Sequence, residues 1–131
     1  MIAIDTSALV ALLFGEPEAD RIAALLDEND TVLIGAPTAL EFRMVVLGQS
    51  TRNAADAGSA LIAKPPFVIV PFGEDHLQVA ADAFDRFGKG RHPARLNYGD
   101  CMAYAVAALA DCPLLFKGDD FRQTDVVVAL D

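Results

Sequence analysis

The sequence predicts an α/β fold, a three-layer α/β/α sandwich around a mostly parallel central sheet of about five strands. Short apolar segments that suit strands alternate along the chain with longer segments that suit helices, which is typical of βαβ units. The predicted strands are apolar throughout, as in a sheet that helices cover on both faces. The 131 residues, 53% of them hydrophobic, suit a single domain spanning residues 1–131 and exclude intrinsic disorder.

The first half of the chain predicts two strands and four helices. The strands are the apolar runs Met1–Ile4 and Thr31–Gly35. The helices begin at capping residues or prolines and end at glycines or turns, and they run from Thr6 or Ser7 to Phe14, from Pro17 to about Asp27, from Pro37 to about Gln49 and from about Asn53 to Ala63.

The second half predicts three more strands and two helices. The strands are Phe67–Val70, Leu114–Phe116 and Val126–Leu130, and the helices are the amphipathic His76–Phe87 and Tyr98–Ala110, which Asn97 can cap. Cys101 and Cys112 lie near opposite ends of the second helix, roughly 16 Å apart and too far for a disulfide. Because they also lack zinc-site spacing, we expect both to be buried as apolar residues.

The formal charge of -9 argues against a protein that binds nucleic acid through a generally basic surface. The basic residues are nevertheless concentrated, because four of the ten fall within ten positions. This basic segment consists of Arg86, Lys89, Arg91 and Arg95, with His92 among them. We expect it either to contact nucleic acid or to be a solvated loop.

The sequence contains no predicted membrane span or leader. No apolar run approaches the roughly 20 residues that a membrane-spanning helix requires. Met1 leads directly into Ile-Ala-Ile-Asp, without the basic start and apolar stretch of a signal peptide. These features predict a cytoplasmic protein without a membrane partner.

Five acidic residues follow predicted strands or lie in the helices after them. They are Asp5 after the first strand, Glu41 in the helix after the second, Asp100 in the helix after the basic segment, and Asp119 and Asp120 after the fourth strand. In a parallel sheet these positions meet at the carboxyl edge, where ligands bind. Clustered carboxylates repel one another, and a divalent cation relieves that repulsion. Oxygen-only ligands favour Mg²⁺, or Mn²⁺, and the chemistry of phosphodiester hydrolysis.

Each acid also suits a purely structural role. Asp5 can cap the first helix by accepting a backbone hydrogen bond. Glu41 lies three residues after Thr38, and Asp100 lies three residues after Asn97, which is capping-box spacing. The two acids after the fourth strand are common turn residues. Both interpretations stay open for each residue alone, and the convergence of separate segments on one sheet edge favours the metal site.

Two other phosphate-handling folds fit less well. A haloacid-dehalogenase-like phosphatase also has an aspartate after the first strand, but it needs a second aspartate where this chain has Ser7. A response-regulator receiver needs an aspartate at the end of the third strand, where Val70-Pro71-Phe72-Gly73 offers none. No aromatic residue stands out in the sequence as a platform for base stacking.

Four segments, in chain order and with fitting spacing, resemble one family. They are Met1-Ile-Ala-Ile-Asp5-Thr-Ser-Ala-Leu-Val, Leu40-Glu41, Gly88-Lys-Gly-Arg-His-Pro-Ala-Arg-Leu-Asn-Tyr-Gly-Asp100-Cys and Leu114-Leu-Phe-Lys-Gly-Asp-Asp-Phe121. The pattern is similar to that of PIN-domain nucleases, in particular the VapC-type toxins of bacterial toxin–antitoxin pairs, and the resemblance extends over the whole chain.

The resemblance implies a Mg²⁺-dependent endoribonuclease that a VapB-type antitoxin holds inactive, and it implies a homodimer. Asp5, Glu41 and Asp100 match the family's acidic triad and would bind the metal. The positions that orient those acids are matched by Thr6, Ser7 and Asn97. Water activated by the metal would hydrolyse RNA and leave 5′-phosphate and 3′-hydroxyl ends.

The fourth acid is where this sequence departs from the family. Many relatives have a Thr-x-Asp-x-x-Phe pattern, and counting back from Phe121 places Phe116 at the threonine and Gly118 at the aspartate. Asp119 or Asp120 can substitute only from one or two residues away. We therefore expect one firmly bound Mg²⁺, with a second recruited by the substrate. The alternative is a catalytically silent PIN-like module that only binds an antitoxin.

Overall fold

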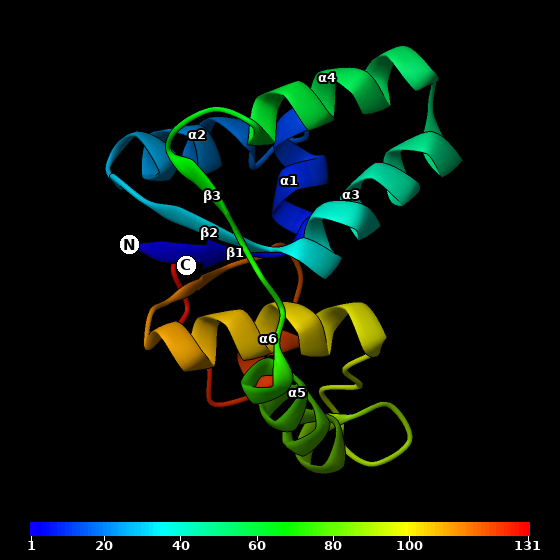
Figure 1. Cartoon of the computed structure of the whole chain (residues 1–131), viewed down its shortest axis with the longest axis vertical. Coiled ribbons are helices and arrows are strands. Elements are labelled where there is room, and N and C mark those ends of the chain that lie inside the picture. The colour runs from blue at the N-terminus through cyan, green and yellow to red at the C-terminus, as the bar shows by residue number, and fades with distance from the viewer.

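A parallel sheet of four strands separates two layers of helices in the computed structural model, which describes all 131 residues (Figure 1). The strands are β1 (Ile2–Ile4), β2 (Val32–Gly35), β3 (Phe67–Val70) and β4 (Leu114–Leu115). Their spatial order is β3-β2-β1-β4, and every pairing is parallel. The predicted α/β class and parallel sheet are confirmed, with four strands in place of about five.

The predicted fifth strand, Val126–Leu130, is wrong. Only Val128 pairs, in an isolated parallel bridge to Leu114. The Leu114 N–H donates to the Val127 carbonyl at 2.8 Å, and the Ala129 N–H donates to the Leu114 carbonyl at 3.0 Å. β4 ends at Leu115 and the chain then turns away, so β4 is too short to pair along the whole of this C-terminal segment.

Four helices cover one face of the sheet and two cover the other (Figure 1). The first layer holds α1 (Thr6–Leu13), α2 (Ala19–Asp27), α3 (Ala36–Gln49) and α4 (Arg52–Ile62), and the second holds α5 (Glu74–Phe87) and α6 (Tyr98–Ala110). The largest departures from the predicted bounds are two residues each: Pro17 lies in the turn that precedes α2, and α5 begins at Glu74 instead of His76. No helix has the length and apolar character that a membrane crossing requires.

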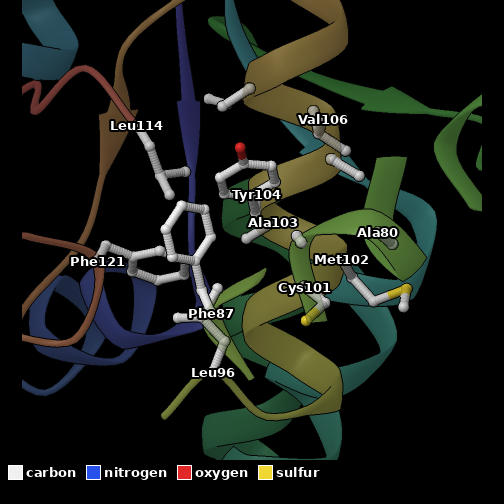
Figure 2. Close-up of a cluster of buried hydrophobic side chains, with 14 of the residues drawn as sticks. Ala80, Phe87, Leu96, Cys101, Met102, Ala103, Tyr104, Val106, Leu114 and Phe121 are labelled. Carbon is white, nitrogen blue, oxygen red and sulfur yellow. The ribbon is translucent and has the colours of Figure 1, made fainter. Parts of the chain in front are cut away.

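Successive side chains of each central strand pack alternately into two separate hydrophobic cores. Ile2 and Ile4 of β1 pack in the core under α1 to α4, whereas Ala3 packs in the core under α5 and α6. Figure 2 shows part of the second core, where Leu114 and Phe121 lie beside α6. Burial on both faces explains why the central strands are apolar throughout. The edge strand β3 departs from this expectation, since two of its four side chains are exposed.

The two cysteines carry free thiols and differ in burial. Cys101 lies inside the second core, as predicted (Figure 2). Cys112 is only half-buried, because it lies in the short connection between the end of α6 and β4.

The strand order reverses at β1, and this reversal positions the site. The chain runs from β1 outward through β2 to β3, and then returns through α5 and α6 to β4 on the other side of β1. The carboxyl ends of β1 and β4 therefore lie side by side, joined by the Asp5 N–H donating to the Leu115 carbonyl at 2.9 Å. Such a switch point is where open α/β sheets form a ligand crevice.

Candidate active site

An open pocket of about 400 Å³ lies beyond the carboxyl ends of the strands, and three of the predicted acids line it. Asp5 comes from the end of β1, Glu41 from the second turn of α3 and Asp100 from the first turn of α6. Thr6 and Ser7, predicted to orient these acids, line the same pocket. The parallel topology thus brings together three segments that lie far apart in the sequence.

Asp5 combines a capping role with a place in the pocket. Its Oδ2 accepts hydrogen bonds from the Ser7 N–H at 3.1 Å and from the Ser7 hydroxyl at 2.7 Å, which caps α1. Its Oδ1 receives no hydrogen bond from the chain, although the residue is only 5% exposed. The structural and the metal-binding interpretations of Asp5 are therefore compatible, because each uses a different oxygen.

Burial raises the pKa of Asp5 to about 6, against the opposing effect of the two hydrogen bonds from Ser7. Repulsion from Asp100 and Glu41 adds to the increase. The pKa of Asp100 is also raised, mainly by burial and further by the charges of Asp120 and Glu41, while the Asn97 N–H opposes the shift. No cationic side chain of the protein pairs with these three acids, so their negative charges repel one another without compensation.

Glu41 is oriented by the residue that follows Asp5. The Thr6 hydroxyl donates a short hydrogen bond to Glu41 Oε1. The capping box with Thr38 does not form, since the Thr38 hydroxyl is buried without a partner. The structural interpretation of Glu41 is therefore wrong, and its carboxylate is directed into the pocket rather than back along α3.

Gly99 makes room for the Glu41 carboxylate, and the sequence reasoning missed it. A Cβ atom at position 99 would lie 1.8 Å from Glu41 Oε2, far inside van der Waals contact. Gly99 directly precedes Asp100 in the first turn of α6, where glycine is a poor helix former. The only sign of its role in the sequence is that a glycine lies at the start of a helix, next to a candidate acid.

Asp100 forms the capping box that its spacing predicts. The Asp100 N–H donates to Asn97 Oδ1 at 2.9 Å, and the Asn97 N–H donates to Asp100 Oδ2 at 3.0 Å. Asp100 Oδ1 receives no hydrogen bond from the chain. Asn97 thus fixes the acid from outside the pocket, which it does not line.

Asp119 and Asp120 do not line the pocket. Both are exposed in the turn before the short 3₁₀ helix Phe121–Gln123. The charge of Asp120 nevertheless helps to raise the pKa of Asp100, as the charge of Glu41 does. That one of them serves as a fourth acid stays a prediction. Lys117 and Glu16 line this part of the pocket instead.

The basic segment lies outside the acid pocket, because none of its five side chains lines it. Arg86 is engaged in ion pairs with Asp82 at 3.3 Å and with Asp125 at 3.0 Å, and it stacks on Phe87. His92 Nδ1 accepts the Ala94 N–H at 3.0 Å. These contacts give Arg86 and His92 structural roles, and contact of the segment with RNA stays a prediction.

The donor set fits a hard divalent cation. All three acids offer oxygen, no cysteine or histidine lines the pocket, and Asp5 and Asp100 each keep one oxygen free of chain hydrogen bonds. No three acidic, histidine or cysteine side chains stand close enough to hold one ion as they are arranged. Coordination of one ion by all three acids therefore requires their side chains to move closer together.

Sequence comparison identifies relatives over almost the whole chain. The PIN domain family matches residues 2–127. Ribonuclease VapC30 of Mycobacterium tuberculosis is 37% identical over 123 residues, covering 94% of each chain. Ribonuclease VapC36 of the same organism is 41% identical over 124 residues, covering 94% of this chain and 89% of the relative.

Solved structures share the fold at lower identity. Mycobacterium tuberculosis VapC20, described as a Sarcin-Ricin loop cleaving toxin, superposes with a TM-score of 0.82 at 18% identity and covers 100% of both chains. VapBC2 from Rickettsia felis, bound to a promoter DNA fragment, gives a TM-score of 0.76 at 14% identity over 98% of this chain and 97% of that one. By its sequence match over residues 2–127 and its VapC relatives, this chain belongs to the PIN domain family and, within it, to the VapC group.

Proposed function

We propose that the protein is a metal-dependent endoribonuclease and the toxin component of a VapBC-type pair. The observation that carries the proposal is the pocket in which Asp5, Glu41 and Asp100 converge, two of them with raised pKa values and a free oxygen each. Its VapC relatives, 37% and 41% identical to this chain, are named ribonucleases. The acids and the family therefore point to the same chemistry.

Asp5 and Asp100 would hold Mg²⁺, or Mn²⁺, through their free oxygens, with Glu41 completing the set. A divalent cation bound there supplies Lewis acidity and lowers the pKa of a coordinated water. Ser7 and Asn97 keep the two aspartates fixed by occupying their other oxygens. The chain thus contributes two aspartates that are each held by one oxygen before the substrate arrives, while the other oxygen stays available.

The reaction is hydrolysis at phosphorus. Water gives up a proton to solvent and forms the new bond to phosphorus in line with the 3′-oxygen, the bond from phosphorus to that oxygen breaks, and the oxygen takes up a proton from solvent. Glu41, which Thr6 orients toward the pocket, accepts a hydrogen bond from the attacking water. The products carry 5′-phosphate and 3′-hydroxyl ends, and the ribose 2′-hydroxyl takes no part.

The partner that inhibits the enzyme is a VapB-type antitoxin. Solved relatives of the same fold include a toxin–antitoxin complex from Klebsiella pneumoniae and VapBC-1 from nontypeable Haemophilus influenzae. The acid pocket attracts cationic groups, so an antitoxin arginine that reaches the carboxylates would block both the metal and the substrate.

We expect the protein to form a homodimer through an apolar surface on α3, α5 and α6. Leu40 and Met44 of α3 are 61% and 62% exposed, Leu77 of α5 is 60% exposed and Tyr98 is 76% exposed. Large exposed apolar patches mark protein interfaces. Met44→Glu should therefore yield a monomer by light scattering, whereas Gln78→Glu, which adds the same charge at an exposed polar position of α5, should stay dimeric. A dimer that survives Met44→Glu would place the interface elsewhere.

The test of the proposed function is incubation of the purified protein, free of antitoxin, with total RNA in Mg²⁺, in Mn²⁺ or in EDTA. We expect discrete fragments with 5′-phosphate ends in either metal and none in EDTA. Asp100→Asn should give no fragments, whereas Asp20→Asn, an exposed acid of α2, should cleave normally. Ends that carry 2′,3′-cyclic phosphate, or cleavage that persists in EDTA, would contradict the proposal.

A catalytically silent module is the second candidate, and the missing fourth acid favours it. No acid from the segment after β4 lines the pocket, and the three acids do not yet form a finished cation site. If folded protein binds an antitoxin but leaves RNA intact in both metals, the silent module is the correct assignment.

A further inference from the structure

Lys117 is the only cationic side chain that lines the acid pocket. It follows β4 at the point where the strand order reverses, directly beside the end of β1. Its N–H donates to the Ser7 hydroxyl at 3.0 Å, and that hydroxyl donates to Asp5 Oδ2 at 2.7 Å. Two hydrogen bonds therefore fix the backbone of Lys117 relative to the buried acid.

The ammonium group of Lys117 is held by two carboxylates of the turn between α1 and α2. Nζ donates a short hydrogen bond to Glu16 Oε1 and lies 3.3 Å from Glu18 Oε2. The hydrogen bond to Glu16 raises the pKa of Lys117, so the group stays charged at neutral pH. Ion pairs between side chains about one-third exposed, as these are, contribute little to stability. Stability alone thus gives no reason for a lysine at the pocket.

We propose that Lys117 binds the phosphodiester of the RNA substrate, and that Glu16 and Glu18 hold its ammonium group at the edge of the pocket until RNA arrives. The inference rests on the proposed function. A phosphate entering this pocket meets Asp5, Glu41 and Asp100 as well as Glu16. One divalent cation offsets only part of that charge, and no acid from the segment after β4 lines the pocket to help hold a second cation. Lys117 provides the missing positive charge.

The test uses a labelled single-stranded RNA that contains a cleavage site mapped on total RNA. Lys117→Met should lower kcat/KM by about 10- to 100-fold, the loss expected for one charged hydrogen bond, and should reduce the salt dependence of binding by about one phosphate contact. Lys117→Arg should retain most of the activity. Lys64→Met, which removes an exposed lysine outside the pocket, is the matched control and should behave as wild type.

A variant of Glu16 and Glu18 distinguishes two roles of Lys117: binding the substrate, or holding the turn between α1 and α2 through its ion pairs. Glu16→Gln combined with Glu18→Gln should bind RNA at least as tightly as wild type, because the ammonium group is released. Loss of binding in parallel with Lys117→Met would instead show that the ion pair positions the turn, and it would overturn the inference. Lys117→Met that cleaves like Lys64→Met would also overturn it. Wild-type protein that neither binds nor cleaves RNA would refute the proposed function itself, and this inference with it.

Discussion

Asp5→Asn is expected to abolish RNA cleavage and, at the same time, to stabilise the fold at neutral pH. Cleavage should fall about a hundredfold or more, because the variant loses the charge that holds the cation. Stability should rise because the carboxylate of Asp5 is almost fully buried and is desolvated there without a countercharge. Function and stability thus oppose each other at this residue.

The pH dependence gives the sign of the stability effect. The pKa of Asp5 rises from 3.8 to about 6 on folding, so the folded protein holds this proton more tightly than the unfolded chain. The stability that the protonated Asp5 contributes is fully present below about pH 4. It declines as the pH rises toward 6 and is absent above that. Asp5→Asn should therefore exceed wild type by at most about 3 kcal/mol at pH 7, and the difference should vanish near pH 3.5.

Denaturant unfolding in EDTA at pH 7 and pH 3.5 measures this difference. Asp27→Asn is the matched control, because it removes one charge from an exposed position of α2 and should change neither stability nor cleavage. An Asp5→Asn protein that is less stable than wild type at pH 7, or one that cleaves RNA normally, would contradict the assignment of Asp5.

Gly99→Ala is expected to lower cleavage by about 10- to 100-fold while leaving the protein folded. The added methyl group would lie 1.8 Å from Glu41 Oε2, so the carboxylate must leave its position in the pocket. The cost to the fold is small, because a flexible side chain can move and alanine is the better helix former. The free energy of unfolding should change by no more than about 1 kcal/mol.

Two further variants make the Gly99→Ala prediction specific. Gly48→Ala in α3 adds a methyl group that meets no atom within 4 Å, so it should stabilise the helix slightly and leave cleavage unchanged. Glu41→Asp in the Gly99→Ala background shortens the displaced side chain and should recover part of the activity. Wild-type cleavage by Gly99→Ala would show that the position of the Glu41 carboxylate does not matter.

Much of the fold follows from local sequence patterns, and the exceptions depend on tertiary structure. The apolar strands and amphipathic helices were predictable because each is encoded within a few residues. The segment Val126–Leu130 has the composition of a strand, but its pairing depends on how far β4 extends. Sequence alone does not determine that length, since it depends on where the chain turns at Lys117 and Gly118.

The convergence of Asp5, Glu41 and Asp100 could be predicted for the same reason, because each follows a recognisable strand or lies near the start of a helix. The residues that surround these acids could not be predicted in the same way. Gly99 matters only through its distance from Glu41, and Lys117 enters the pocket through contacts with Glu16, which lies 101 positions away in the chain. The exposed aromatic ring of Tyr98 was missed likewise, because exposure depends on which helices pack beside it.

Calorimetric titration of Mg²⁺ into RNA-free protein at pH 7 tests most directly whether Asp5, Glu41 and Asp100 form one cation site. We predict a single saturable site in the wild-type protein, and affinity that falls at least about tenfold in Asp5→Asn and in Asp100→Asn. Asp119→Asn should bind as wild type does, because Asp119 lies outside the pocket. Equal Mg²⁺ affinity in all four proteins would contradict the account, since the cation would then bind somewhere other than the three converging acids.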